Sequence, residues 1–134
     1  MTEFTLHPRL EADTVFVADW ALSRVLLMND SRYPWLLLVP RRADLTELHD
    51  LSVEDRAALI EEAARAGAAL KSLTGAAKIN IGALGNLVPQ LHLHVVARRP
   101  GDAAWPGSVW GQGERRPYEA PEQEALISRF RLAL

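Results

Sequence analysis

Short apolar runs separated by polar turns occupy the first forty residues of the chain. The stretch TVFVADWALSRVLLM (14–28) holds two such runs, and it fits either two strands joined by a tight turn or one strand followed by a short turn. We favour two strands. The stretch NDSRYP (29–34) has the composition of a turn. The continuous apolar run WLLLVP (35–40) predicts a strand that is covered on both faces.

A long amphipathic helix is the clearest element of the sequence. Ser52 is a good N-cap, and Glu54 and Asp55 fall in the first turn, where the positive end of the helix dipole favours acidic side chains. Apolar side chains then recur at spacings of three and four, and Gly75 is a suitable stop. The predicted apolar stripe consists of Ile60, Ala63, Gly67 and Leu70.

The second half of the chain returns to strand patterns. Residues 76–84 alternate weakly and residues 90–98 alternate strictly between apolar and polar, so both are predicted strands. Residues 99–120 hold four Gly, three Pro and two Trp, which predicts a long ordered loop because Trp side chains are costly to leave in water. Residues 121–134 begin with Pro and predict a short helix.

This order of elements predicts one α+β domain over residues 1–134, with a mostly antiparallel sheet of about five strands, one long helix and a short C-terminal helix. With 134 residues, 49% hydrophobic and 24% charged, the chain has an ordinary globular composition. Its net charge of −2 argues against non-specific binding to nucleic acid or to an anionic membrane.

The chain has no cysteine, which excludes disulfides, thiolate metal sites and a cysteine nucleophile. Its first residues, MTEFTLHPRLEAD, carry no apolar signal core, and no apolar run approaches the ~18 residues of a membrane span. We therefore expect a cytoplasmic protein with no membrane partner.

Two histidines, one residue apart, are the main candidates for a chemical role. In the stretch NLVPQLHLHVVARRP (86–100), strand alternation places Gln90, His92 and His94 on one face and the intervening leucines on the other, which is the natural core face. Same-face neighbours on a strand are roughly 7 Å apart, so both imidazoles could touch one small anionic group.

Three interpretations compete for this pair. The histidines could be solvated side chains on an edge strand. They could be metal ligands, although nothing in the spacing nominates His7, His49 or a carboxylate as the third ligand. They could perform phosphate chemistry, in which one imidazole attacks phosphorus and the other donates to a non-bridging oxygen. The strict alternation beside a Gly-Asn loop favours the third interpretation.

The stretch NIGALGNLVPQLHLHVV (80–96) resembles the signature of the histidine-triad family, in which three histidines alternate with apolar residues. The stretches LMND (27–30) and WLLLVPRR (35–42) resemble the first half of that family, so the resemblance covers roughly residues 14–98. It implies an antiparallel sheet with a helix on it, a homodimer with a continuous sheet, and nucleotide binding with nucleotidyl transfer to water or another acceptor. The phosphate chemistry proposed for the two imidazoles requires no cofactor in principle, although a divalent cation could accompany a polyphosphate substrate.

The resemblance also implies roles for individual residues. His92 matches the nucleophile of the triad, His94 matches the residue that supports the phosphate oxygens, and Gln90 occupies the first triad position. The other implied nucleotide-binding residues are Asp30 for the ribose hydroxyls, and Asn80, Gly85 and Asn86 around the phosphate.

Two departures from the family pattern bear on catalysis. The first triad position is Gln90 rather than His, and Leu87 stands where a Ser or Thr is usual. Because Gln does not titrate, a leaving group that needs a proton should suffer most. The leading hypothesis is a hydrolase or nucleotidyltransferase that acts on a dinucleoside polyphosphate or a similar nucleotide ester. The alternatives are a non-catalytic nucleotide-binding module and a metal-dependent enzyme.

The remaining polar and aromatic candidates are weaker. His7 and His49 lie in polar segments, so both are expected at the surface. Trp105 and Trp110 are expected to pack in the core or at a dimer contact; the sharper hypothesis is that one of them lines the nucleotide pocket.

Overall fold

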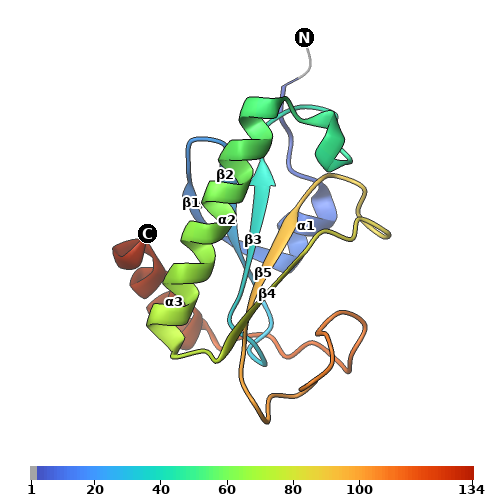
Figure 1. Ribbon diagram of the computed structural model, residues 1–134. Coiled ribbons are helices and arrows are strands. Elements are labelled where there is room, and N and C mark those ends of the chain that lie inside the picture. The colour runs from blue at the N-terminus through green and yellow to red at the C-terminus, as the bar shows by residue number, and fades with distance from the viewer. Residues whose placement is uncertain (1–2) are drawn as a thin grey trace.

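The computed structural model describes residues 3–134, and one five-stranded antiparallel sheet forms its centre (Figure 1). The strands lie in the order β1-β2-β3-β5-β4, and each neighbouring pair is antiparallel. The predicted α+β fold is therefore confirmed, with β3 at the centre. The strands are β1 (Thr14–Asp19), β2 (Ser23–Met28), β3 (Trp35–Pro40), β4 (Lys78–Gly82) and β5 (Leu93–Arg98).

The predicted long helix and C-terminal helix are both present as α2 (Val53–Thr74) and α3 (Ala120–Ala133). In Figure 1, α2 crosses one face of the sheet and α3 lies beside its C-terminal end. The structure adds α1 (Pro8–Asp13) and a 3-10 turn at Leu48–Asp50, which are too short to show a periodicity in the sequence.

Both ends of α2 form as the sequence predicts. The Ser52 hydroxyl accepts a hydrogen bond from the Asp55 N–H at 3.1 Å, which satisfies one of the free donors at the helix start. Gly75 adopts the left-handed conformation with φ 68°, and its N–H donates to the Lys71 carbonyl at 2.9 Å.

The predicted apolar stripe of α2 is wrong at Ile60, which is 62% exposed. Each residue turns the helix by about 100°, so the stripe centred on Leu59 leaves Ile60 at the edge of the buried face. Ala63, Gly67 and Leu70 are buried as predicted.

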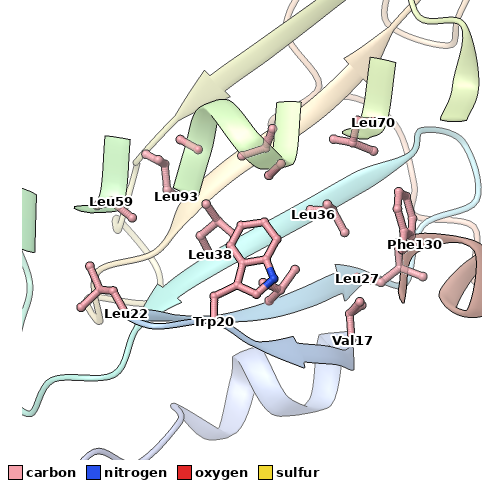
Figure 2. Packing of buried hydrophobic residues seen from close by; sticks show 14 of the residues in the cluster. Val17, Trp20, Leu22, Leu27, Leu36, Leu38, Leu59, Leu70, Leu93 and Phe130 are labelled. Carbon is pink, nitrogen blue, oxygen red and sulfur yellow. The ribbon is translucent and has the colours of Figure 1, made fainter. Parts of the chain in front are cut away.

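The main core lies between the sheet and the two long helices (Figure 2). Leu59 and Leu70 of α2 point toward the strand side chains, and Trp20 fills the centre of this layer. Burying one such aliphatic side chain contributes about 1.5–3 kcal/mol. The strand residues that face this core include Leu27, Leu36, Leu38, Leu93 and Val95.

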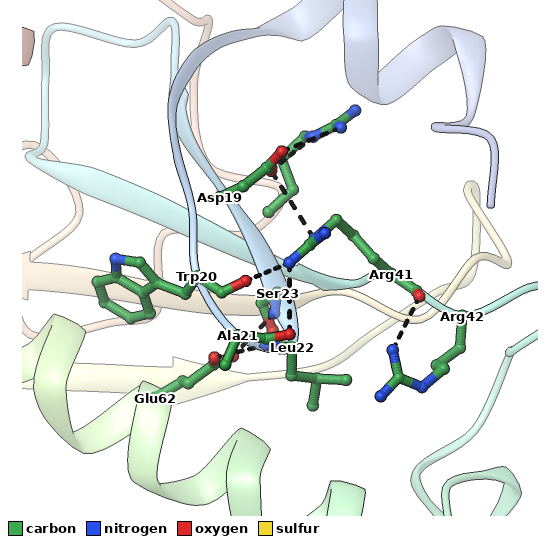
Figure 3. Close-up of polar contacts among 9 residues, drawn as sticks. Asp19, Trp20, Ala21, Leu22, Ser23, Arg41, Arg42 and Glu62 are labelled. Carbon is green, nitrogen blue, oxygen red and sulfur yellow. Dashed lines mark hydrogen bonds and ion pairs between the residues drawn. The ribbon is translucent and has the colours of Figure 1, made fainter.

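A buried carboxylate joins α2 to the β1–β2 turn (Figure 3). Glu62 is 8% exposed, and its two oxygens accept hydrogen bonds from the backbone N–H groups of Leu22 and Ser23, each at 3.0 Å. On the same turn, the Arg41 guanidinium donates to the carbonyls of Trp20 and Ala21. The turn between the first two strands is thus held by side chains as well as by its own backbone.

The strand that carries the histidines is shorter than predicted. The sequence predicts a strand over 90–98, whereas β5 begins at Leu93. The N–H of Leu91 donates to the Leu45 carbonyl at 2.9 Å, in the connection before α2, so the chain has not yet joined the sheet there. Alternation within a strand therefore does not extend back to Gln90.

Candidate active site at a histidine pair

His92 and His94 lie together on the face of the sheet opposite α2. His94 pairs with Leu37 of β3 and Gly82 of β4, and His92 stands just before β5 begins. Their ring centroids are 4.8 Å apart, with the planes at 68°. Each side chain belongs to a residue that is 6% exposed, so this is a desolvated imidazole pair rather than a solvated edge of the sheet.

The hydrogen-bond partners of the two rings assign different tautomers to them. Nδ1 of His92 lies 2.7 Å from the Gln90 carbonyl, which can only accept, so the proton sits on Nδ1 and Nε2 carries a lone pair. Nδ1 of His94 accepts from the indole N–H of Trp35 at 3.0 Å, so its proton sits on Nε2. The pair therefore combines a nitrogen with a free lone pair and an N–H donor.

Both imidazoles are held neutral. Burial lowers the pKa of His92, against a raising effect from the hydrogen bond to Gln90, and the nearby His7 lowers it further. Burial, together with the neighbouring His92, lowers the pKa of His94 to about 3. At neutral pH, His94 can donate a hydrogen bond from Nε2 but is not charged.

The histidine pair opens onto a cleft of about 580 Å³, a size typical of small-molecule sites. One group of lining residues is apolar or aromatic: Leu10, Met28, Trp35, Leu84, Leu87, Val88, Val109 and Trp110. A second group brings polar or charged atoms, and consists of Arg9, Asp13, Asp30, Arg32, Asn86, Gln112 and Arg115.

Gly85 and Asn86 lie in this cleft beside the histidines. Gly85 has a φ of 72°, the left-handed region that favours glycine, and it turns the 83–90 loop along the cleft wall. Among the sequence candidates, the structure therefore brings together His92, His94, Gly85 and Asn86.

Asp30 also lines the cleft, but its carboxylate already has several partners. The Arg32 guanidinium donates to both of its oxygens, at 2.8 Å for the shortest contact, and the backbone N–H of Arg116 adds a longer bond of 3.4 Å. Burial raises the pKa of Asp30, but the hydrogen bonds from Arg32 and Arg116 outweigh this and hold the pKa below its usual value. Asp30 is thus an ionised anchor for Arg32 and for the loop that contains Arg116.

Gln90 and Asn80 lie outside the lining of this cleft. The Gln90 amide accepts from the His7 N–H and donates to the Thr5 carbonyl, both at 2.8 Å, so it ties down the N-terminal segment. The Asn80 carbonyl oxygen accepts from Arg98 at 2.8 Å, within a separate buried cluster that includes Asp102. The predicted row of two imidazoles and an amide on one face therefore separates at Gln90.

Trp35 is a site residue that the sequence pattern does not single out. It lies in a run predicted to be buried on both faces, and nothing in that run marks the indole N–H as a partner for a histidine 59 positions away. Trp110 lines the cleft and Trp105 does not, so Trp110 is the loop tryptophan that fits the hypothesis of a pocket-lining residue. His49 is exposed, as expected, with 82% of its side chain accessible.

Neither a membrane span nor a metal cluster is found within residues 3–134. No helix in this part of the chain is long and apolar enough to cross a membrane. Among the same described residues, no group of three or more His, Cys, Asp or Glu side chains is placed to hold a metal ion.

The fold and the site define an α+β protein with a desolvated histidine pair set into a cleft on the face of the sheet opposite its long helix. The family model of the HIT domain matches residues 9–101, and the chain belongs to that family. The resemblance in the sequence is therefore confirmed at the level of the family.

Solved structures agree over nearly the whole chain. A histidine triad protein from Sinorhizobium meliloti is 50% identical with a TM-score of 0.96, covering 98% of this chain and 97% of its own. One from Bradyrhizobium japonicum is 49% identical with a TM-score of 0.96, covering 98% of both chains. One from Marinobacter aquaeolei is 41% identical with a TM-score of 0.97, covering 99% and 97%. A search of curated proteins finds no match.

Proposed function

We propose that this protein binds a nucleotide in the cleft and acts as a hydrolase or nucleotidyltransferase at the α-phosphate. The observation that carries the proposal is the pairing of tautomers, in which His92 presents a lone pair at Nε2 and His94 presents an N–H donor next to it. Membership of the HIT domain family supports the substrate class.

In the first step, Nε2 of His92 attacks the α-phosphorus in line. The new P–N bond forms as the bond from phosphorus to the leaving oxygen breaks, and the leaving group departs with the electron pair. His94 donates from Nε2 to a non-bridging oxygen, and backbone N–H groups of the loop at Gly85 and Asn86 add further donors. Removing one such donor typically lowers the rate by ~10²–10³.

In the second step, water or another acceptor attacks the nucleotidyl-His92 intermediate. The P–N bond breaks, its electron pair returns to Nε2 of His92, and the acceptor releases its proton to solvent. With water the product is the nucleoside monophosphate; with another acceptor it is a new ester or amide.

The nature of the site favours a leaving group that needs no proton. The pKa of His94 is about 3, so at neutral pH this ring holds no spare proton to transfer. Gln90, at the first triad position, does not titrate, and its amide is occupied by Thr5 and His7. A polyphosphate leaves readily as an anion, so a dinucleoside polyphosphate is the substrate class we propose.

The other implied residues take supporting roles in this proposal. Asp30 acts mainly by holding Arg32 in the cleft, since the oxygens of Asp30 already accept several hydrogen bonds. Asn80 acts at a distance, through Arg98. A homodimer with a continuous sheet is also proposed, because the edge strand β4 and the loop after it expose Ile81, Leu84 and Leu87.

A specific observation favours a second candidate, a nucleotide-binding module without catalysis. Gln90 stands where the family signature has a histidine, and its side chain is hydrogen-bonded to the N-terminal segment instead of lining the cleft. In that case the cleft would bind nucleotides, and no intermediate would form on His92.

One experiment separates the candidates. The protein is incubated with diadenosine tetraphosphate, with and without a chelator, and compared with His92→Ala and with His49→Ala as an exposed control. We expect turnover in wild type and His49→Ala, none in His92→Ala, and a phosphoramidate on His92 in a rapid quench analysed by mass spectrometry. Binding without turnover would support the module, and loss of turnover with chelator would support the metal-dependent enzyme.

A further inference from the structure

The segment between β5 and α3, residues 99–119, forms one wall of the cleft. The match to the family model ends at residue 101, so almost all of this segment lies beyond it. In Figure 1 it runs as the orange loop below the sheet before the chain enters α3. Val109 and Trp110 of this segment both line the cleft, and Val109 is only 2% exposed.

Polar contacts hold this wall to the turn between β2 and β3. Arg32 donates to the Gln112 carbonyl at 2.7 Å, and the Ser31 N–H donates to the Arg116 carbonyl at 2.6 Å. A further bond of 2.9 Å runs from the Tyr118 N–H to the side chain of Asn29. With this many attachments, the segment is a fixed part of the site rather than a free loop.

The Trp110 ring packs directly against the histidine pair. Its centroid is 5.5 Å from that of His94, with the planes at 70°. Beneath it is Gly82, the strand partner of His94; a Cβ at that position would lie 3.0 Å from Cη2 of the indole. The indole therefore lies over β4 in a space that exists because residue 82 has no side chain.

The indole N–H of Trp110 is buried and has no partner. Four buried side-chain nitrogen or oxygen atoms within residues 3–134 lack a hydrogen bond, on Ser23, Tyr33, Arg41 and Trp110. Of these, Trp110 is the residue that lines the cleft. A buried donor without an acceptor is unfavourable, and such a donor at a ligand site is explained when the ligand supplies the acceptor.

The acceptor is best matched by an anionic oxygen. The two carboxylates of the cleft, Asp13 and Asp30, are each paired with an arginine, so no unpaired carboxylate among the described cleft residues repels an anion. His94, which touches the Trp110 ring, already presents its own N–H donor to the same region.

We propose that Nε1–H of Trp110 is a further ligand-binding donor, directed at an oxygen of the phosphate group that the histidine pair holds. This inference rests on the proposed function and adds to it. Residues 99–119 then take part in binding the phosphate group, because they set the distance between the indole N–H and the phosphorus that His92 attacks.

The test measures affinity by titration calorimetry, using the 5′-monophosphates of adenosine, guanosine, cytidine and uridine and the four nucleosides. Trp110→Phe keeps an aromatic ring and removes the donor. We expect it to weaken nucleoside monophosphate binding by about tenfold or more, since the lost bond is to a charged group. The affinity for the nucleosides should change by less than about twofold, because they lack the phosphate oxygens.

Two further variants keep the test decisive if Trp110→Phe packs poorly. Gly82→Ala keeps the Trp110 indole but adds a methyl group beneath it, which should displace the ring. This variant should therefore also weaken monophosphate binding. Trp105→Phe changes the other tryptophan of the same segment, which does not line the cleft, and should leave binding unchanged. The melting temperature of each free variant reports whether the fold is kept.

The outcomes separate the two proposals. Monophosphate binding by Trp110→Phe at wild-type affinity overturns the role of the donor and leaves the proposed function intact. An equal loss for nucleosides and monophosphates also overturns it, because the ring would then serve only as packing surface. Wild-type protein that binds none of the four monophosphates overturns the proposed function, and this inference with it.

Discussion

Trp35 donates its indole N–H to Nδ1 of His94 over 3.0 Å, although 59 positions separate the two residues in the chain. The bond joins β3 to β5 on the cleft side of the sheet and decides which nitrogen of His94 carries the proton. The N–H that His94 presents to the cleft therefore depends on a residue that itself has no titratable group.

Trp35→Phe should reduce turnover while leaving His92 unchanged. Without the indole donor, His94 can exchange between its two tautomers, and the fraction that donates into the cleft falls. We expect a decrease in kcat of about tenfold, less than the ~10²–10³ for removing a donor outright. Nitrogen-15 NMR should show His94 protonated at Nε2 in wild type and mixed in the variant. An unchanged tautomer in the variant would contradict this role of Trp35.

The pH dependence of activity should reflect the lowered pKa of His92. His92 attacks only when it is uncharged, and burial lowers its pKa from the usual value of 6.5. Activity should therefore rise with pH along a limb that lies below 6.5 and be level above it. The measurement is kcat/KM against pH, with a substrate that does not titrate in this range. A limb centred at or above 6.5 would show that His92 is not desolvated as described.

Stability should also decrease as the pH falls, and His94 should account for part of the decrease. The pKa of this imidazole is ordinarily 6.5 and is about 3 in the folded protein, so between these values the unfolded chain binds more protons. The contribution is complete above 6.5 and is lost as pH decreases toward 3. Between pH 6.5 and 5 this amounts to about 1.5 kcal/mol. His94→Gln, which keeps an acceptor for Trp35, should show a shallower decline in denaturant titrations at the two pH values.

Glu62→Ala should destabilise the fold without altering the cleft. The change leaves the buried N–H groups of Leu22 and Ser23 without an acceptor, and we expect a loss of about 2–4 kcal/mol in the free energy of unfolding. Glu61→Ala, on the exposed side of the same helix, is the matched control and should change stability by less than ~0.5 kcal/mol. Equal effects of the two substitutions would mean that the carboxylate does not hold the β1–β2 turn.

Gln90→Ala should show whether the Gln90 side chain positions the N-terminal segment or acts on the substrate. The backbone carbonyl of residue 90 still accepts from His92, so we expect kcat to fall by less than about tenfold. The N-terminal segment loses both of its contacts with the amide, so the His7 N–H should exchange faster with deuterium. If Gln90→Ala were as inactive as His92→Ala, the amide would have to act on the substrate directly.

The fold could be predicted well from local patterns. The capped helix from Ser52 to Gly75, the turn at 29–34 and the buried strand at 35–40 each depend on residues close together in sequence, and all form as expected. The errors lie at boundaries. The sequence pattern predicts a strand from Gln90 onward, but Leu91 donates its N–H to Leu45 and the strand starts only at Leu93.

Local sequence was enough to nominate His92 and His94 as a pair, because neighbouring positions on one extended stretch are close whatever the rest of the chain does. It could not assign their protons, since these depend on Trp35 from another strand and on a carbonyl whose direction is set by the path of the chain before β5. Nor could it show that Gln90 turns to the N-terminal segment or that Trp110 covers Gly82. Those contacts join segments far apart in the chain, and only packing of the whole sheet brings them within hydrogen-bonding or van der Waals distance.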